Sequence, residues 1–393
     1  MKVFGELNPT YRILMGPGPS NVHPRVLKAM STPLVGHLDP EFLAIMNEVM
    51  ELLRGLFQTR NSFTIPVSGT GSAGMEALFC NIIEEGDTVI VCVNGLFGQR
   101  MSDIVERCRG RLIRLEAPWG EAINPEQLEQ ALRQSKTKMV AVVHAETSTG
   151  VWQPLEELAK IAHKYGALFL VDTVTSLGGC PVKVDEWGID LVYSGTQKCL
   201  SCPPGLAPVS FNEKAIEVVR KRSSKVQSWY LDMTMIEKYW GSERFYHHTA
   251  PISMIYALRE SLRLIAEEGL EERFHRHKLN HQALAAGLGA LEIGYLPKVG
   301  ERLWMLNAVR VPEGIDELKV RKQLLLEHNI EIGGGLGDLK GKIWRIGLMG
   351  HSCNRQNVLT FLSALEEALS NEGYKVSPGA SLTAAATVYG ISL

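Results

Sequence analysis

The segment GALFLVDTVTSLGGC (166–180), followed after ten residues by LVYSGTQKCLSCPPG (191–205), decides the fold. An apolar run in the first segment closes on Asp172, and a second run leads through the turn Ser-Gly-Thr-Gln to Lys198. Short runs rich in aliphatic and β-branched residues are typical of buried parallel strands. We therefore expect the acid and the lysine to share the rim of an α/β sheet, where open sheets bind their ligands.

An anion and a primary amine at one rim suit the cofactor pyridoxal 5′-phosphate (PLP). The amine of Lys198 can condense with the PLP aldehyde as a Schiff base, and Asp172 can keep the pyridine nitrogen protonated, so that the ring accepts electrons. A lysine with the ordinary pKa of about 10.4 is a poor nucleophile, and burial corrects this because it disfavours the charged form. A buried ion pair without chemistry is the alternative interpretation of these two residues.

The same residues carry a resemblance to a known family. LFLVDTVTSLGG and YSGTQKCL, with Lys198 placed 26 residues after Asp172, resemble the class V, fold-type-I PLP aminotransferases, and most closely the alanine–glyoxylate aminotransferase group. Further segments extend the likeness over nearly the whole chain: LMGPGPSN (14–21), SGTGSAGMEA (68–77), HAETSTG (144–150), FYHHTAP (245–251) and IWRIGLMG (343–350). The resemblance implies an α/β fold: a large domain with a mainly parallel seven-stranded sheet between helices, and a smaller α+β C-terminal domain.

Size and composition are consistent with this expectation. The chain has 393 residues, of which 45% are apolar and 21% charged, as in globular proteins with a sizeable core. A net charge of −2 argues against partners recognised by charge alone, so we expect neither a nucleic-acid nor a membrane partner. The N-terminus has no signal or transit pattern, and Ile391-Ser392-Leu393 lacks the basic residue of a peroxisomal signal. With seven cysteines in no framework spacing, we expect a cytoplasmic protein.

Strand and helix patterns alternate from residue 62 to about 211, which predicts a mainly parallel sheet with right-handed crossovers. A long helix predicted over 252–268 ends at Gly269 and connects the sheet domain to the C-terminal one. We expect three segments: an N-terminal arm (1–20), a large PLP-binding domain (21–268) and a small C-terminal domain (269–393).

A glycine-rich turn, 69–74, lies between a predicted strand and a predicted helix. Its pattern GxGxxG is formally a dinucleotide fingerprint, which makes an NAD-dependent dehydrogenase a rival hypothesis. That fingerprint needs an acid at the carboxyl end of the next strand, and the strand over 87–94 carries Asp87 at its start instead. A helix N-terminus that binds one phosphate monoester is therefore favoured. By the resemblance, this loop binds the PLP phosphate through Thr70, Gly71 and Ser72.

Four further residues are assigned to the site. By the resemblance, Phe97 stacks on the pyridine ring, Thr147 contacts the cofactor or the substrate carboxylate, and Gln197 bonds the phosphate. Arg345 lies inside an apolar strand, where an unpaired guanidinium is costly. Its planar charge suits bidentate binding of a carboxylate, and the resemblance implies the α-carboxylate of the substrate. A structural salt bridge is the alternative.

The motif Arg-Phe-Tyr-His-His-Thr (244–249) resembles a metal site only at first sight, because adjacent histidines point apart and no third ligand has suitable spacing. The resemblance instead implies a homodimer in which Tyr246 and Thr249 reach the cofactor of the neighbouring subunit. His37 and Gly18 are expected at the substrate.

The resulting hypothesis is a ping-pong transamination from a small donor, L-alanine or L-serine, to glyoxylate, which gives glycine and a 2-oxo acid. The alternative within the family is an (S)-ureidoglycine–glyoxylate aminotransferase of purine catabolism, which segments 118–121 and 377–389 resemble. In that group the positions of His37 and Tyr246 tend to carry glutamine and asparagine, so these residues favour alanine. Cysteine desulfurases are disfavoured because residues 327–342 contain no cysteine.

Overall fold

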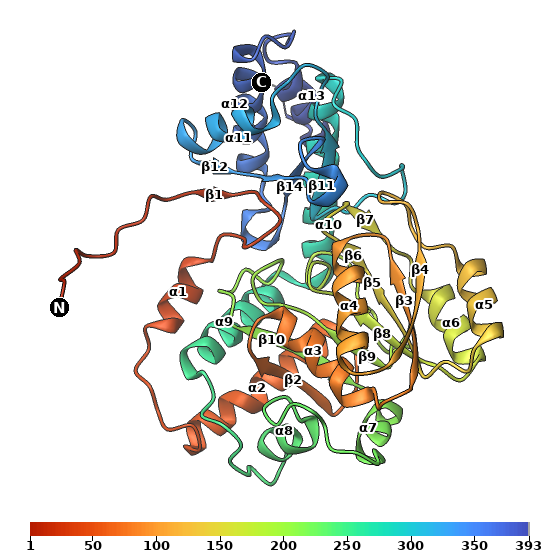
Figure 1. Cartoon of the computed structure of the whole chain (residues 1–393). Helices are drawn as coiled ribbons and strands as arrows, with labels where there is room; N and C mark the ends of the chain where they lie inside the picture. The colour runs from red at the N-terminus through yellow and green to blue at the C-terminus, as the bar shows by residue number, and fades with distance from the viewer. Residues whose placement is uncertain (392–393) are drawn as a thin grey trace.

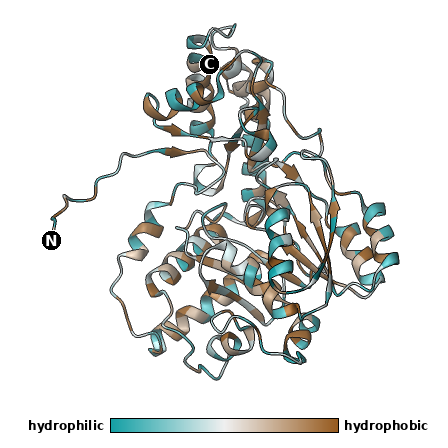
Figure 2. Cartoon of the chain, viewed as in Figure 1, coloured by the Kyte–Doolittle hydropathy of each residue, from teal (hydrophilic) through white to brown (hydrophobic). Residues whose placement is uncertain are grey.

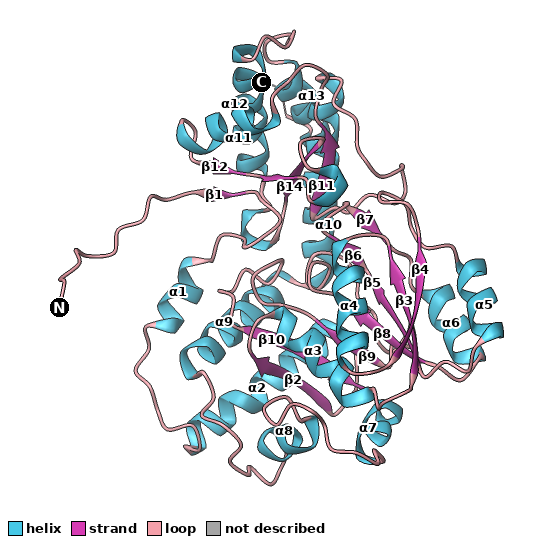
Figure 3. Ribbon diagram, in the orientation of Figure 1, coloured by secondary structure: helices cyan, strands magenta, loops and turns pink. Residues whose placement is uncertain are grey.

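A seven-stranded sheet forms the centre of the larger part of the molecule (Figures 1 and 3). The computed structural model describes residues 1–391, so the last two residues of the C-terminal tripeptide discussed above lie outside the described residues. In order across the sheet, the strands are β2 (Phe63–Ser68), β10 (Leu206–Phe211), β9 (Leu191–Tyr193), β8 (Leu168–Asp172), β5 (Met139–Val143), β3 (Thr88–Val93) and β4 (Arg111–Glu116). Strand β10 runs antiparallel to both of its neighbours, and the other pairs are parallel. The predicted mainly parallel α/β sheet is confirmed.

The inner strands β5, β8 and β9 are predominantly apolar (Figure 2), and Asp172 at the end of β8 is their one charged residue. Every residue of β5, β8 and β9 is buried, because helices cover both faces of a parallel sheet. The edge strand β4 alternates between exposed and half-buried residues. The contrast explains why the two runs that end at Asp172 and before Lys198 were recognisable as strands.

The helices of this part pack on the sheet or on one another (Figure 1). They are α1 (Pro24–Met30), α2 (Pro40–Phe57), α3 (Gly71–Ile82), α4 (Leu96–Arg107), α5 (Pro125–Gln134), α6 (Glu156–Lys164), α7 (Glu213–Arg220), α8 (Met233–Trp240) and α9 (Ile252–Glu268). Helix α2 begins with a side-chain cap: Asp39 is its N-cap and accepts a hydrogen bond from the amide of Glu41 at 2.8 Å, and Pro40 stands at the first helical position, where no amide is needed.

The C-terminal part has its own apolar cluster and its own sheet, β11-β14-β13. Its elements are α10 (Leu270–Ala290), β11 (Leu306–Arg310), α11 (Glu317–Leu326), β12 (Ile330–Glu331), β13 (Gly333–Gly334), β14 (Ile343–Gly347), α12 (Arg355–Asn371) and α13 (Ala380–Tyr389), with short 3-10 turns at Gly337–Leu339 and Gly350–Ser352. Strand β1 (Ile13–Leu14) pairs in parallel with β12. The N-terminal strand thus joins the C-terminal part. The domain limits 20/21 and 268/269 stay predictions.

Helix α13 packs closely against α10, and one glycine permits the approach. A Cβ on Gly287 of α10 would lie 3.0 Å from the carbonyl oxygen of Ser381 and 2.5 Å from Leu362. The buried carboxylate of Glu366 caps the start of α13: Oε2 accepts from the Gly379 amide (2.8 Å), and Oε1 accepts from the Ser381 amide (2.8 Å) and hydroxyl (2.6 Å). Helix α13 is therefore a packed element of the C-terminal part.

Residues 1–11 are exposed and extend away from the rest of the chain (Figure 1). Large apolar side chains on this arm are exposed, among them Phe4, Leu7 and Tyr11. None of the helices within residues 1–391 has the length and apolar character that crossing a bilayer requires.

Candidate active site

A cavity of about 160 Å³ lies at the carboxyl ends of β5, β8 and β9. Eight residues singled out from the sequence line it together: Thr70, Gly71, Ser72, Phe97, Thr147, Asp172, Gln197 and Lys198. The predicted meeting of acid and amine at one rim is therefore observed, because β8 and β9 are parallel neighbours with Asp172 opposite Tyr193.

Asp172 is held rigidly at the floor of the cavity. Its Oδ1 accepts from the amide of Val174 at 2.7 Å, and its Oδ2 accepts from the hydroxyl of Tyr193 at 2.6 Å. The side chain is only 3% exposed, and this burial raises the pKa of Asp172 to about 7, although the two hydrogen bonds oppose the shift. Because both of its oxygens accept hydrogen bonds, the carboxyl group has a fixed orientation toward a neighbouring cation.

Lys198 lines the same cavity. It is 8% exposed, and burial, assisted by the positive charge of Arg345, lowers its pKa to about 8. Its amine donates to the carbonyl oxygen of Pro17. Gly18 allows this approach: its φ is +103°, and a Cβ there would lie 2.6 Å from the lysine Nζ. The predicted substrate residue Gly18 thus contacts Lys198 directly.

One end of the cavity is the N-terminus of α3. Its N-cap, Thr70, makes no side-chain capping bond to the helix within the described residues. The first amides of a helix left without a cap attract an anion. Nearby, Oε1 of Gln197 is buried without a hydrogen-bond partner in residues 1–391. The helix amides are the donors for a phosphate; Oε1 of Gln197 is an acceptor, so only the Nε2 group of this side chain can donate to the same anion.

The ring of Phe97 lines another wall, at the first turn of α4. The guanidinium of Arg100, one turn later, lies over this ring with its Cζ 4.9 Å from the centroid. Such a cation–π contact, within about 6 Å, orients an aromatic side chain. Phe97 is therefore a fixed planar wall rather than a mobile cap.

Arg345, on β14 of the C-terminal part, adjoins the cavity. Its Nε donates to the carbonyl oxygen of Gly334 (2.7 Å) and its Nη1 to that of Thr147 (3.3 Å). Burial lowers the pKa of Arg345 to about 10, and the negative charge of Glu146 opposes this shift. Arg345 has no salt-bridge partner among the described residues, so its charge is available to a carboxylate. The structural alternative, a salt bridge, is absent from that part of the chain.

Tyr246, Thr249 and His37 lie outside the cavity of their own chain. The hydroxyls of Tyr246 and Thr249 are 3.4 Å apart, and the ring centroids of His37 and Tyr246 are 5.0 Å apart. Tyr246 is 51% exposed. These three predicted residues thus form a separate group at the surface.

Three residues at or beside the cavity were not found from the sequence: Tyr193, which bonds Asp172, Arg100 beside Phe97, and the buried Glu146. Tyr193 is the last residue of the apolar strand β9. An aromatic residue with a hydroxyl group at the end of a strand was the sequence feature that could have pointed to it. Arg100 follows Phe97 by three residues, which is one helical turn. Glu146 lies inside a quoted motif, but nothing in its spacing marks it as buried.

The donor set fits PLP. A phosphate can be held by the N-terminus of α3, a ring nitrogen by Asp172, an aldehyde by the amine of Lys198, whose pKa is lowered to about 8, and the ring face by Phe97. Each functional group of PLP therefore has a protein group of complementary chemistry in the cavity.

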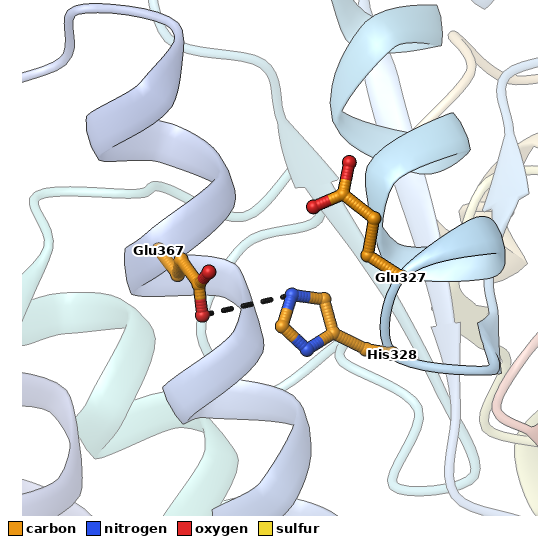
Figure 4. A group of neighbouring side chains, drawn as sticks. All are labelled: Glu327, His328 and Glu367. Carbon is orange, nitrogen blue, oxygen red and sulfur yellow. Dashed lines mark ion pairs between the residues drawn. The ribbon is translucent and has the colours of Figure 1, made fainter.

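Other clusters in residues 1–391 have no comparable chemistry. Glu327, His328 and Glu367 place ligand atoms within 4.8 Å of one another, with His328 Nε2 3.7 Å from Glu367 Oε2 (Figure 4). Both carboxylates are exposed, and no further ligand joins them in the described chain. A larger hollow of about 480 Å³ contains Arg273 and Arg276, whose guanidinium groups already donate to Glu268 and to backbone carbonyls.

Comparisons with known proteins agree with the geometry. The family model "Aminotransferase class-V" matches residues 13–338. The chain is 42% identical to an alanine–glyoxylate aminotransferase of Rattus norvegicus, over 92% of this chain and 88% of the rat protein.

Two solved structures are close in fold. An alanine–glyoxylate aminotransferase from Nostoc sp. superposes with a TM-score of 0.92 at 49% identity and covers 94% of this chain and 98% of its own. A ureidoglycine–glyoxylate aminotransferase from Bacillus subtilis superposes with a TM-score of 0.97 at 45% identity, covering 98% of this chain and 100% of its own.

Proposed function

The chain belongs to the class-V aminotransferase family, and we propose that it transfers the amino group of L-alanine to glyoxylate, giving glycine and pyruvate. As a member of this family it is an aminotransferase with PLP as cofactor, and its substrates are an amino acid and a 2-oxo acid. The predicted fold type I is confirmed by the two superpositions. The dehydrogenase hypothesis drawn from residues 69–74 is thereby excluded.

The single observation that supports the proposal most is the shared cavity of Asp172 and Lys198. When bound, PLP supplies an electron sink and carries the amino group between the two substrates. We assign Thr70, Gly71, Ser72 and Gln197 to its phosphate, Phe97 to its ring face and Asp172 to its ring nitrogen. Thr147 contacts the cofactor or the substrate carboxylate.

Lys198 has two roles in the proposal. Its amine would hold the cofactor aldehyde, and as a free amine it would take the proton from Cα of the amino acid and give it back later in the same half-reaction. A base for this step needs a pKa near the working pH, and burial of Lys198 gives such a value, about 8.

Arg345 binds the α-carboxylate of the donor in the proposal. Its charge is unpaired within the described chain, and its guanidinium is already oriented by the carbonyl oxygens of Gly334 and Thr147. These bonds leave further N–H donors of the five that a guanidinium carries. The donor would therefore lie with its Cα within reach of Lys198, whose pKa responds to the nearby charge of Arg345.

The choice of donor rests on His37 and Tyr246, which pack together. By the resemblance, the ureidoglycine group tends to carry glutamine and asparagine at these two positions, so His37 and Tyr246 favour a small donor, L-alanine or L-serine. The second candidate is (S)-ureidoglycine, because the Bacillus subtilis ureidoglycine enzyme matches this chain over nearly all of its length, tail included.

Absorption spectra of the purified, PLP-loaded protein test the function. Addition of L-alanine alone is expected to bleach the yellow colour of the bound cofactor, and glyoxylate is expected to restore it, because each half-reaction leaves the cofactor in a different form. L-serine serves as the second small donor and L-glutamate as the charged control. A protein that ignores L-alanine and L-serine but responds to freshly prepared ureidoglycine would replace the first candidate with the second.

We also propose that the active enzyme is a homodimer in which Tyr246 and Thr249 complete the site of the partner. Both lie at the surface and outside their own cavity. The exposed Phe245 precedes Tyr246 in the chain, and the exposed Trp229 stacks on the next residue, His247. Exposed aromatic residues that gather on one face mark protein interfaces. A two-fold axis would place each group at the neighbouring site.

Hybrid dimers test this arrangement. Lys198→Ala and Tyr246→Ala proteins, each poorly active alone, are expected to regain about a quarter of wild-type activity after subunit exchange, because half of the dimers are mixed and each mixed dimer contains one intact site. If Tyr246 acts within its own subunit, exchange restores nothing.

A cytoplasmic location is part of the proposal. All seven cysteines lie within the described residues, are buried and are free thiols, as is usual in a reducing compartment.

A further inference from the structure

A carboxylate with no role in the proposed chemistry lies behind the cavity. Glu146, in the short strand β6 (Ala145–Glu146), is 0% exposed. Its Oε1 accepts from the amide and hydroxyl of Ser148 at 3.0 and 2.6 Å, and its Oε2 accepts from the amide of Phe97 at 3.1 Å. Burial raises its pKa, although these bonds oppose the shift. A carboxylate kept without solvent is costly, so its position calls for an explanation.

Glu146 first fixes the start of α4. The N-cap of this helix is Gly95, which has no side chain to offer, and the first two helix amides are satisfied from the other loop: Leu96 donates to Ser148 Oγ at 2.9 Å and Phe97 to Glu146. A negative group is favoured at a helix N-terminus. The approach is so close that a Cβ on Gly95 would lie 2.4 Å from Cδ of Glu146. The carboxylate therefore sets the backbone from which the Phe97 ring projects into the cavity.

Glu146 also fixes the turn that carries Thr147. This residue stands between Glu146 and Ser148, lines the cavity, and accepts the bond from Nη1 of Arg345 through its carbonyl oxygen. The amide of Gly150 closes the turn onto the carbonyl oxygen of Glu146 at 2.8 Å. One buried side chain thus connects Phe97 on α4, Thr147 on its own loop and, through Thr147, the arginine of the C-terminal part.

We propose that Glu146 is a positioning residue of this active site, whose carboxylate aligns Phe97 and Thr147 against the PLP ring and keeps Arg345 in register for the substrate carboxylate. The inference rests on the roles proposed above for those three residues. Glu146 itself need not touch substrate or cofactor.

The test compares E146Q with a matched control, E366Q. Glu366 accepts the same set of bonds, from one serine amide and hydroxyl on Oε1 and from one further amide on Oε2, and it also caps a helix, α13, far from the cavity. In each variant the new amide group must face one of these N–H donors, which leaves a buried donor unpaired. Both proteins are therefore expected to lose thermal stability to a similar extent.

Only E146Q is expected to change the site. Its dissociation constant for PLP, measured by equilibrium dialysis, should rise by about 10- to 100-fold, the equivalent of one unpaired buried donor. The visible circular dichroism of the bound cofactor should weaken because the ring is less firmly oriented, and KM for L-alanine should rise through Arg345. E366Q should keep the wild-type values of all three.

Two results would overturn the proposal: an E146Q protein with wild-type PLP affinity and dichroism, or an E366Q protein that loses both equally. If E146Q does not fold, G95A takes its place, since it keeps the carboxylate but crowds it, and wild-type PLP affinity in G95A then contradicts the proposal. A wild-type protein that binds PLP but reacts with no amino donor would instead contradict the proposed function. The PLP affinities of E146Q and E366Q could still be compared in that case, because they do not depend on a reaction with the donor.

Discussion

Replacing Lys198 by alanine is expected to lower kcat by about 10⁴-fold, the upper end of what a general acid–base group contributes. In the proposed function the lysine both binds the cofactor and moves the proton, and alanine can do neither. The decay of the cofactor absorbance after mixing with L-alanine measures the effect in a single turnover. Lys198→Arg should fail equally, because a guanidinium remains protonated and cannot act as base.

The matched control is Lys221→Ala. Lys221 is an exposed lysine whose pair with Glu217, one turn away, spans 2.7 Å, and such surface pairs contribute about 0–1 kcal/mol. Its activity should remain within about twofold of wild type. A Lys198→Ala protein that keeps more than about a tenth of the wild-type rate would assign the proton transfer to another group.

The lowered pKa of Lys198 determines how the rate of PLP association should depend on pH. Only the neutral amine reacts with an aldehyde, so the rate at which PLP associates with the apoprotein should rise about tenfold per pH unit below 8 and level off above it. An unshifted lysine would instead give a rate that rises to pH 10 or higher. Because the positive charge of Arg345 contributes to the lowering, Arg345→Gln should move the plateau to higher pH.

Asp172→Asn is expected to lower kcat by about 10²- to 10³-fold, the usual loss when one preorganised charged or hydrogen-bonding group is removed from a reacting centre. The amide is nearly isosteric, but it is neutral and cannot stabilise a protonated ring nitrogen. PLP should still bind through its phosphate, so the variant is expected to be coloured and slow. Stopped-flow absorbance with saturating L-alanine separates slow chemistry from weak binding.

The control for this substitution is Asp232→Asn. Asp232 is the N-cap of α8 and accepts from the amide of Thr234 at 2.9 Å, a position in which asparagine serves equally well. It should leave both stability and rate unchanged. Asp172→Asn with a wild-type rate would mean that this carboxyl group does not meet the ring nitrogen.

Much of the site could be predicted because its signals are local. Apolar runs that end in Asp172 and before Lys198 are read within about ten residues, and the rule that parallel strands end at a common edge brings the two together. The Asp39-Pro40 cap of helix α2 is a local signal of the same kind, since a cap lies within one turn of the helix that it starts. The sequence did not indicate that β10 runs antiparallel to its neighbours, because a buried strand has the same composition in either direction.

The roles of Tyr246, Thr249 and His37 remain predictions, since they depend on a second subunit. Their grouping at the surface of one chain supports the proposed dimer.

By itself the sequence determined the α/β architecture, the rim that carries the acid and the amine, and the helix N-terminus at that rim, because each depends on side-chain periodicity and turn chemistry over short stretches. The tertiary structure alone decided which distant residues meet. Glu146 reaches Phe97 across 49 residues, and the carbonyl oxygen of Pro17 meets the Lys198 amine across 181. Such contacts follow from the register and close packing of whole elements, for which glycines at positions 18 and 95 leave the space.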